Sequence, residues 1–299
     1  MAALLGLLGA FSWAGADFLA RHVSRLIGPV RTFILAQCVG LGALTVYLAI
    51  AGDPHWSLAL TFGSATRPAD EWALGAALLN ILGSMCLYRS FAIGKMALVT
   101  PIAASYPGLT VVLALASGER LKTNSAVGIP IILAGIMLAV IPLARSVAPV
   151  DDRGGRPRLH GDHAGVGWAL TAALCFGVAF WVLGFHVTAR LGGVVPIWII
   201  RFSGATLILG LVARRRSQPV LPPGKIARPL VASALLDTAG FVATTLGLAT
   251  GHVSVVTVLT SLFGVVIILM SWVLLRERLH WRQWCGVALI FAGVALVSM

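Results

Sequence analysis

The sequence contains few charged residues. Asp, Glu, Lys and Arg make up 11% of its 299 residues and hydrophobic residues make up 59%, whereas an ordinary soluble domain has about 25% charged residues. A soluble protein of this length could not bury so much apolar surface, and the exposed remainder would cause aggregation. The composition therefore excludes a soluble globular protein and predicts an integral membrane protein.

Acidic residues are the scarcer of the two charge types. The chain has 10 Asp and Glu against 22 Lys and Arg, which gives a formal net charge of +12. Such a charge can indicate nucleic-acid binding, but here the basic residues lie in short gaps between apolar runs and form no basic stripe with aromatic residues. Basic residues in membrane loops determine orientation instead. We therefore expect membrane lipids as partners and no nucleic acid.

The sequence also lacks the motifs of metal and nucleotide sites. Its four cysteines lie far apart inside apolar runs without a CxxC, which argues against a disulfide framework or a zinc site. GxxxxGK[ST], HExxH and GxSxG are absent, so nothing indicates an ATP-driven pump or a hydrolase of these types. The HGDH at 160–163 has no third ligand near it in the sequence. We predict no metal, no cofactor and no enzymatic activity.

What the sequence does contain is long apolar runs. A helix needs about 20 mostly apolar residues to cross a bilayer, and open strands cannot cross it because lipid offers no partner for the backbone. The first run has no basic residues before it, which predicts a retained membrane helix and not a signal peptide. We expect an all-α integral membrane protein with ten transmembrane helices. The predicted spans are 2–20, 31–51, 72–93, 96–117, 124–144, 164–189, 195–213, 229–250, 253–275 and 281–298.

The chain repeats itself. A linker at 145–163, rich in Pro, Gly and charge, separates residues 1–144 from residues 164–299. ALLNILG at 77–83 matches ALLDTAG at 234–240, and the tripeptide Glu-Arg-Leu at 119–121 recurs at 277–279. Because each half holds five predicted helices, an odd number, the second half must enter the membrane from the opposite side. This predicts two inverted five-helix repeats, an architecture of secondary transporters with a central site between the repeats.

Several segments resemble the EamA domain of the ten-helix members of the drug/metabolite transporter superfamily. ERLKTNSAVGIPIILAGIML and ERLHWRQWCGVALIFAGVAL are similar to the end of that domain, FSWAGADFLAR to its first helix, and ALVTPIAASYPGLTVVLALASGERL to its fourth helix. The resemblance implies a multi-pass protein of the inner (cytoplasmic) membrane that works as a monomer. It also implies transport of a small metabolite, such as an amino acid or a related amine, by alternating access without ATP.

Three other functions remain open from the sequence. A flippase for a lipid-linked sugar or another lipid head group is the nearest alternative, because it would use the same architecture. A membrane-embedded lipid-modifying enzyme is an alternative of another class, although no nucleophile lies beside a base in the sequence. A channel or a membrane scaffold is the third, and the inverted repeat favours transport over it.

Polar residues at membrane depth are the candidates for the transport site, because burying them is unfavourable. Asn80 and Asp237 occupy the same position of the two repeats and would face each other across the pseudo-twofold axis. There Asp237 could hold a cargo amine or carry a coupling proton. The alternative is that Asp237 forms a structural ion pair with Arg201. Asp17 is a second coupling candidate, although Arg21 follows it by four residues and could pair with it along the helix.

Two prolines interrupt the predicted fourth helix. Each removes a backbone donor, and the freed carbonyl groups must be satisfied by protein, water or cargo. Broken helices often mark a transporter site, and a simple packing kink is the alternative. We predict that residues around these prolines and their repeat partners line the site. They are Thr100, Pro101, Ser105 and Tyr106 in the first half and Thr257, Ser261 and Phe263 in the second.

Two further expectations concern packing and orientation. Small residues at helical spacing, Gly135 with Ala139 and Ala288 with Ala292, predict a close contact between the fifth and tenth helices. Of the 22 basic residues, 17 lie in or beside the odd-numbered gaps between helices and four in or beside the even-numbered gaps. The positive-inside rule then predicts both termini outside the cytoplasm, whereas the family resemblance implies both inside.

Overall fold

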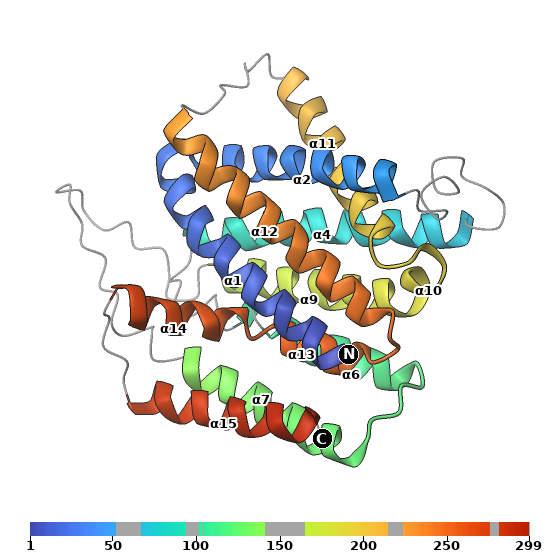
Figure 1. Ribbon diagram of the computed structural model, residues 1–299, viewed down its shortest axis with the longest axis vertical. Coiled ribbons are helices and arrows are strands. Elements are labelled where there is room, and N and C mark those ends of the chain that lie inside the picture. The colour runs from blue at the N-terminus through green and yellow to red at the C-terminus, as the bar shows by residue number, and fades with distance from the viewer. Residues whose placement is uncertain are drawn as a thin grey trace.

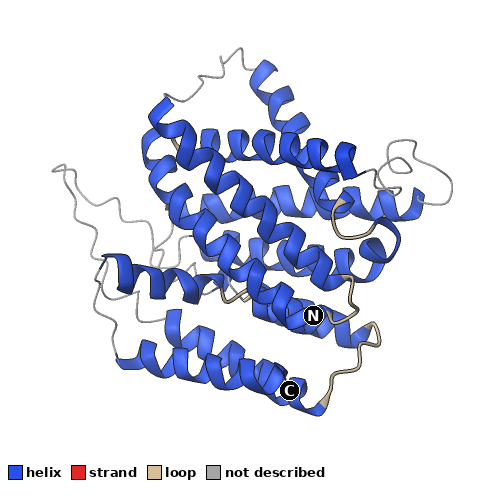
Figure 2. Cartoon of the chain, viewed as in Figure 1, coloured by secondary structure: helices blue, strands red, loops and turns tan. Residues whose placement is uncertain are grey.

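The computed structural model describes residues 1–51, 67–93, 102–103, 105–140, 165–214, 224–275 and 281–298. Within these ranges the chain is helical and contains no strand (Figure 2). The first half contains α1 (Ala2–Ile27), α2 (Pro29–Ala51), α4 (Arg67–Ile93), α6 (Tyr106–Ala116) and α7 (Thr123–Val140). The second half contains α9 (Val166–Val182), the π-helix η1 (Leu183–Val187), α10 (Thr188–Leu191), α11 (Val195–Arg214), α12 (Gly224–Leu248), α13 (Val253–Thr260), α14 (Phe263–Leu275) and α15 (Trp281–Ser298).

Four helical stretches are long and apolar enough to cross a membrane. They are Ala2–Ala20, Val30–Ala51, Val166–Leu191 and Ile226–Leu248, and they correspond to the predicted spans 2–20, 31–51, 164–189 and 229–250. Shorter apolar helices overlap the predicted fourth, fifth, seventh, ninth and tenth spans. An all-helical architecture with apolar spans is therefore confirmed for the part of the chain that the structure describes.

α1 and α12 cross near the middle of the bundle and pack on each other (Figure 1). Small residues are common on the buried face of α1, among them Ala10 and Ala14. Leu4, Leu8 and Phe11 are exposed on the opposite face at helical spacing. This apolar outer face suits contact with lipid tails, and the inner face brings α1 close to the second half of the chain.

α7 and α15 lie side by side at one edge of the bundle (Figure 1). A Cβ atom on Gly128 would lie 2.8 Å from the carbonyl oxygen of Gly293, and one on Gly135 would lie 2.9 Å from that of Gly286. The two helices therefore run antiparallel with their backbones in contact. The predicted close packing is present at Gly135. The choice of Ala288 and Ala292 was wrong, because both are exposed and the contact face of α15 carries Gly286 and Gly293 instead.

Candidate functional site

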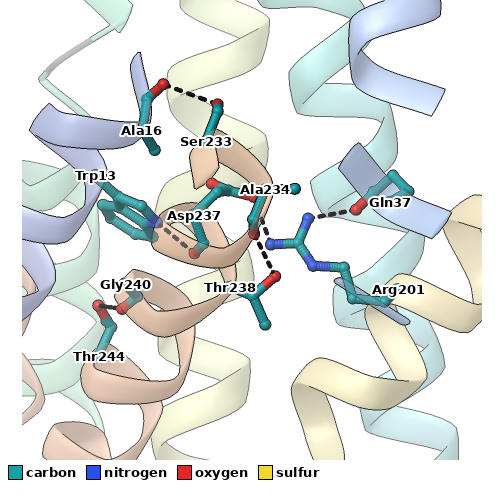
Figure 3. A network of polar contacts seen from close by, with 10 residues as sticks. All are labelled: Trp13, Ala16, Gln37, Arg201, Ser233, Ala234, Asp237, Thr238, Gly240 and Thr244. Carbon is teal, nitrogen blue, oxygen red and sulfur yellow. Dashed lines mark hydrogen bonds and ion pairs between the residues drawn. The ribbon is translucent and has the colours of Figure 1, made fainter. Parts of the chain in front are cut away.

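The centre of the site is a buried cation. Arg201 on α11 is 3% exposed, and its Nη2 lies 2.5 Å from Oδ2 of Asp237 on α12. Its Nη1 donates a hydrogen bond to Oε1 of Gln37 on α2 (Figure 3). The guanidinium group also lies over the ring of Phe241, 5.1 Å from its centroid. A buried charge is tolerated only when it is paired and hydrogen-bonded, and Arg201 meets this condition through side chains of α2 and α12.

Two glycines make room for this arrangement. A Cβ atom on Gly40 of α2 would lie 3.2 Å from Nε of Arg201, and one on Gly204 of α11 would lie 2.7 Å from Nε2 of Gln37. Larger residues at either position would displace the Arg201 and Gln37 side chains. Gln37 is a polar residue inside the predicted apolar span 31–51, and this polarity is the signal in the sequence for its role here.

Asp237 is thus the partner of Arg201. The sequence left two options for this carboxylate, a free coupling acid or a structural ion pair, and its geometry is that of the pair. The Asp237 side chain lies on the same face of α12 as the buried Ser233 and Thr244. It is still 31% exposed. Its backbone carbonyl accepts a hydrogen bond from Nε1 of Trp13 at 3.2 Å (Figure 3). Asp237 therefore connects α1, α11 and α12.

Asp17 is the second carboxylate at this depth. It lies one turn beyond Trp13 on the inner face of α1, opposite the exposed Leu4 and Phe11. Ser233 of α12 donates a hydrogen bond of 2.9 Å to the carbonyl oxygen of the adjacent Ala16, so this face packs directly on α12. Even so, the Asp17 side chain is exposed. The Asp17 carboxylate is therefore accessible on the face of α1 that packs on α12, and it lies within electrostatic range of Asp237.

Aromatic rings surround the same region. Trp13 meets Phe241, Phe180 and Phe263 with ring centroids 4.8, 6.0 and 6.0 Å apart. Tyr106 stacks on Phe180 at 5.5 Å, and its buried hydroxyl group has no hydrogen-bond partner among the described residues. Such rings can stabilise an organic cation through their faces. The sequence predicted Tyr106 and Phe263 as site residues, and the structure brings both to this cluster.

Tyr106 and Phe263 both follow a break in their helix. α6 begins at Tyr106 with Pro107 in its first turn, a position where a backbone donor is not needed. In the second half α13 ends at Thr260 and α14 begins at Phe263. Pro107 therefore lies in the first turn of α6, and Pro101, the other proline of the predicted interruption, lies outside the described residues. The second break has no proline, so no proline could indicate it in advance.

Asn80, the residue predicted to face Asp237, lies on α4. Asn80 is 7% exposed on α4, which packs against α9 and α11, while α12 packs against α1 and α2. No hydrogen bond joins the side chains of Asn80 and Asp237, both of which the structure describes. Their common repeat position does not produce a hydrogen bond between them.

The remaining predicted residues contribute little polar surface. The hydroxyl groups of Thr257 and Ser261 are buried and donate to their own helix, to the carbonyl oxygens of Val253 and Val258. Ser105 likewise donates to the carbonyl oxygen of Ile102 at 2.7 Å. Thr100 and Pro101 lie outside the described residues.

Comparison with known proteins identifies the family. The model of the EamA-like transporter family matches residues 1–141 and again residues 163–299. The chain belongs to this family. The resemblance noted in the sequence is thereby confirmed, and membership in the EamA-like transporter family indicates a multi-pass membrane transporter of the drug/metabolite superfamily.

Two individual proteins are also similar to this chain. An uncharacterized protein of Methanocaldococcus jannaschii is 28% identical over 141 residues, which cover 47% of this chain and 96% of that protein. A solved crystal structure shares the fold, with a TM-score of 0.73, 21% identity, and coverage of 99% of this chain and 96% of that chain. The second likeness concerns the fold alone.

Proposed function

We propose that the protein is a secondary transporter in the inner (cytoplasmic) membrane that moves a small amine-bearing metabolite, such as an amino acid, by alternating access at a central cavity. The observation that carries this proposal is the accessible carboxylate of Asp17 on the inner face of α1, beside the Arg201–Asp237 pair. A cationic amine held by Asp17 would lie near the rings of Trp13 and Phe241, which favour a cation.

The charges of the site suit this cargo. Asp237 is committed to Arg201, so with both carboxylates ionised the three groups carry one net negative charge, and it belongs to Asp17. That carboxylate can exchange an amine for a proton, which makes Asp17 the coupling candidate and Asp237 the residue that holds Arg201 in place. The pair of Arg201 and Asp237 then serves as the fixed wall of the cavity.

The contacts of α7 and α15 support the inverted repeats that alternating access requires. Gly128 and Gly286 occupy one repeat position, and Gly135 and Gly293 occupy another. Gly128 meets Gly293 while Gly135 meets Gly286, which is the reciprocal pattern expected of a twofold axis between two equivalent helices. The archaeal relative, which matches half of this chain over nearly all of its own length, fits a building block of one repeat.

Asp17→Asn tests the amine site. A thermal-shift screen of the purified protein against amino acids, amines and sugars should find stabilising amines, and Asp17→Asn should remove at least about 90% of their binding affinity, since a charged hydrogen-bonded contact contributes roughly 1.5–3 kcal/mol. Glu71→Gln makes the same change of charge on an exposed side chain of α4 and is the control. Stabilisation by sugars alone, or equal amine binding in both variants, would contradict an amine-bearing cargo.

The orientation of the chain is a separate prediction. If the 17 basic residues of the odd-numbered gaps face the cytoplasm, both termini lie outside it. A reporter that is active only in the cytoplasm should then be inactive when fused to the C-terminus and active when fused after residue 150 in the linker. The reverse pattern would place both termini inside.

A further inference from the structure

Glu119 connects the two halves of the chain at one end of the bundle. α6 ends at Ala116, and Gly118, with φ of +92°, reverses the chain direction after it. The carboxylate of Glu119 then accepts three hydrogen bonds from Ser254 at the start of α13. The backbone N–H donates to Oε1 and Oε2 at 3.2 and 3.1 Å, and the hydroxyl group donates to Oε2 at 2.7 Å. Ser254 itself is 0% exposed.

This contact satisfies the first turn of α13. The first backbone N–H groups of a helix have no partner within it, and the N-cap residue His252 provides no side-chain hydrogen bond to them. Glu119 supplies one from a residue 135 positions earlier, and its negative charge is also favourable at a helix N-terminus. The start of α13 is therefore held by a side chain of the opposite half.

The bundle is closed at this end. Every residue of α13 from Val253 to Thr260 is buried. A Cβ atom on Gly184 of η1 would lie 2.5 Å from a methyl group of Val253, and one on Gly6 of α1 would lie 2.9 Å from Leu259. The beginning of α1 packs here, so this is the end of the bundle that carries the N-terminus (Figure 1).

We propose that the hydrogen bonds between Glu119 and Ser254 are a latch that keeps the cavity closed on the side of the chain termini and that breaks when the cavity opens to that side. This inference rests on the proposed transport function, because alternating access requires the two halves to separate at each side in turn. A carboxylate suits the role. It binds the helix N-terminus strongly where water is excluded and is well hydrated once water enters.

The latch also assigns a role to the repeated tripeptide. Glu119 is the first residue of the Glu-Arg-Leu segment that recurs at 277–279. The sequence showed the repetition without a reason for the acid. In the first copy of the tripeptide, the Glu119 carboxylate binds Ser254 in the second half of the chain. Residues 277–279 lie outside the described ranges.

Labelling of a single cysteine tests the latch without knowledge of the substrate. Val258, one turn after Ser254 on the same face of α13, is 0% exposed, and Val258→Cys is a small change. The background chain has its own four cysteines, at 38, 86, 175 and 285, replaced by Ala. With this chain in oriented vesicles, Glu119→Ala and Ser254→Ala should each accelerate labelling by a membrane-impermeant maleimide roughly tenfold, because a hydrogen bond to a carboxylate is lost.

The acceleration should occur only when the maleimide is on the side of the termini. The double variant should react no faster than the faster single variant, since both changes break one contact. Arg120→Gln, at the neighbouring exposed position, should label at the parent rate. Parent rates in both latch variants, or acceleration from the opposite side, would overturn the latch. The labelling rates are measured without cargo. If the amine screen fails, the labelling experiment still tests the latch.

Discussion

Asp237→Asn is expected to destabilise the protein by about 3–5 kcal/mol and to abolish transport, because it leaves the Arg201 charge without its counterion in the interior. Gln37 and the new amide could still accept hydrogen bonds from the guanidinium group, but neutral amides cannot compensate a buried cation. The measurement is thermal or denaturant unfolding of the purified variant in detergent, with uptake in proteoliposomes as the second readout.

The double variant Arg201→Met with Asp237→Leu separates the structural role from the transport role. Removing both charges of a buried pair is often neutral for stability, so this variant should recover most of the stability that Asp237→Asn loses. Transport should stay absent, because the fixed wall of the cavity has gone. The sequence-based alternative gives another pattern: if Asp237 carried the coupling proton, Asp237→Asn would keep its stability and exchange cargo, yet fail to accumulate it in a pH gradient.

The helices could be predicted from the sequence because bilayer thickness sets their length. The stretches that are long and apolar enough to cross the membrane begin or end within a few residues of the predicted spans, as at Val30–Ala51 and Ile226–Leu248. The family was recognisable for a related reason. The two copies of Glu-Arg-Leu and the apolar run after each are local patterns, and local patterns can be read without knowledge of the fold.

The site could be predicted only in part, because its contacts join residues far apart in the chain. Sequence identified Asp17, Asp237 and Arg201 as polar residues at membrane depth, but the choice between a free acid and an ion pair depended on how α11 and α12 pack. The bond from Trp13 to the carbonyl oxygen of Asp237 spans 224 positions, and no local pattern indicates it. The repeat matched Asn80 with Asp237 in sequence, yet α4 packs mainly on α9 and α12 packs mainly on α1.

The contact between α7 and α15 shows how a prediction from helix periodicity can select the wrong face of a helix. Helix periodicity predicted small residues at this interface, but α15 has small residues on more than one face. Ala288 and Gly286 are two residues apart, which is about 200° around a helix, so a small error of register selects the wrong face. The carbonyl contacts of Gly128 and Gly135 decide between them.

Gly293→Leu should therefore be one of the most damaging substitutions in the protein. A Cβ atom there would lie 2.9 Å from the carbonyl oxygen of Gly128 and 3.1 Å from the backbone nitrogen of Ile132. Side chains can rotate away from an intruding group, but these are backbone atoms of a packed helix, so α7 and α15 would have to separate. We expect a loss of about 3 kcal/mol or more in unfolding free energy, and little monodisperse protein on size-exclusion chromatography.

Ala292→Leu is the matched control, because it introduces the same side chain one residue earlier on an exposed face of α15 and should leave the unfolding midpoint unchanged. Gly135→Leu provides a further comparison. Gly135 occupies the repeat position of Gly293, and a Cβ atom on it would meet the Gly286 carbonyl oxygen at the same 2.9 Å. If a twofold axis relates α7 and α15, the two leucine variants should lose similar stability. Equal midpoints for Gly293→Leu and Ala292→Leu would contradict the backbone contact, and a large difference between Gly135→Leu and Gly293→Leu would contradict the symmetry.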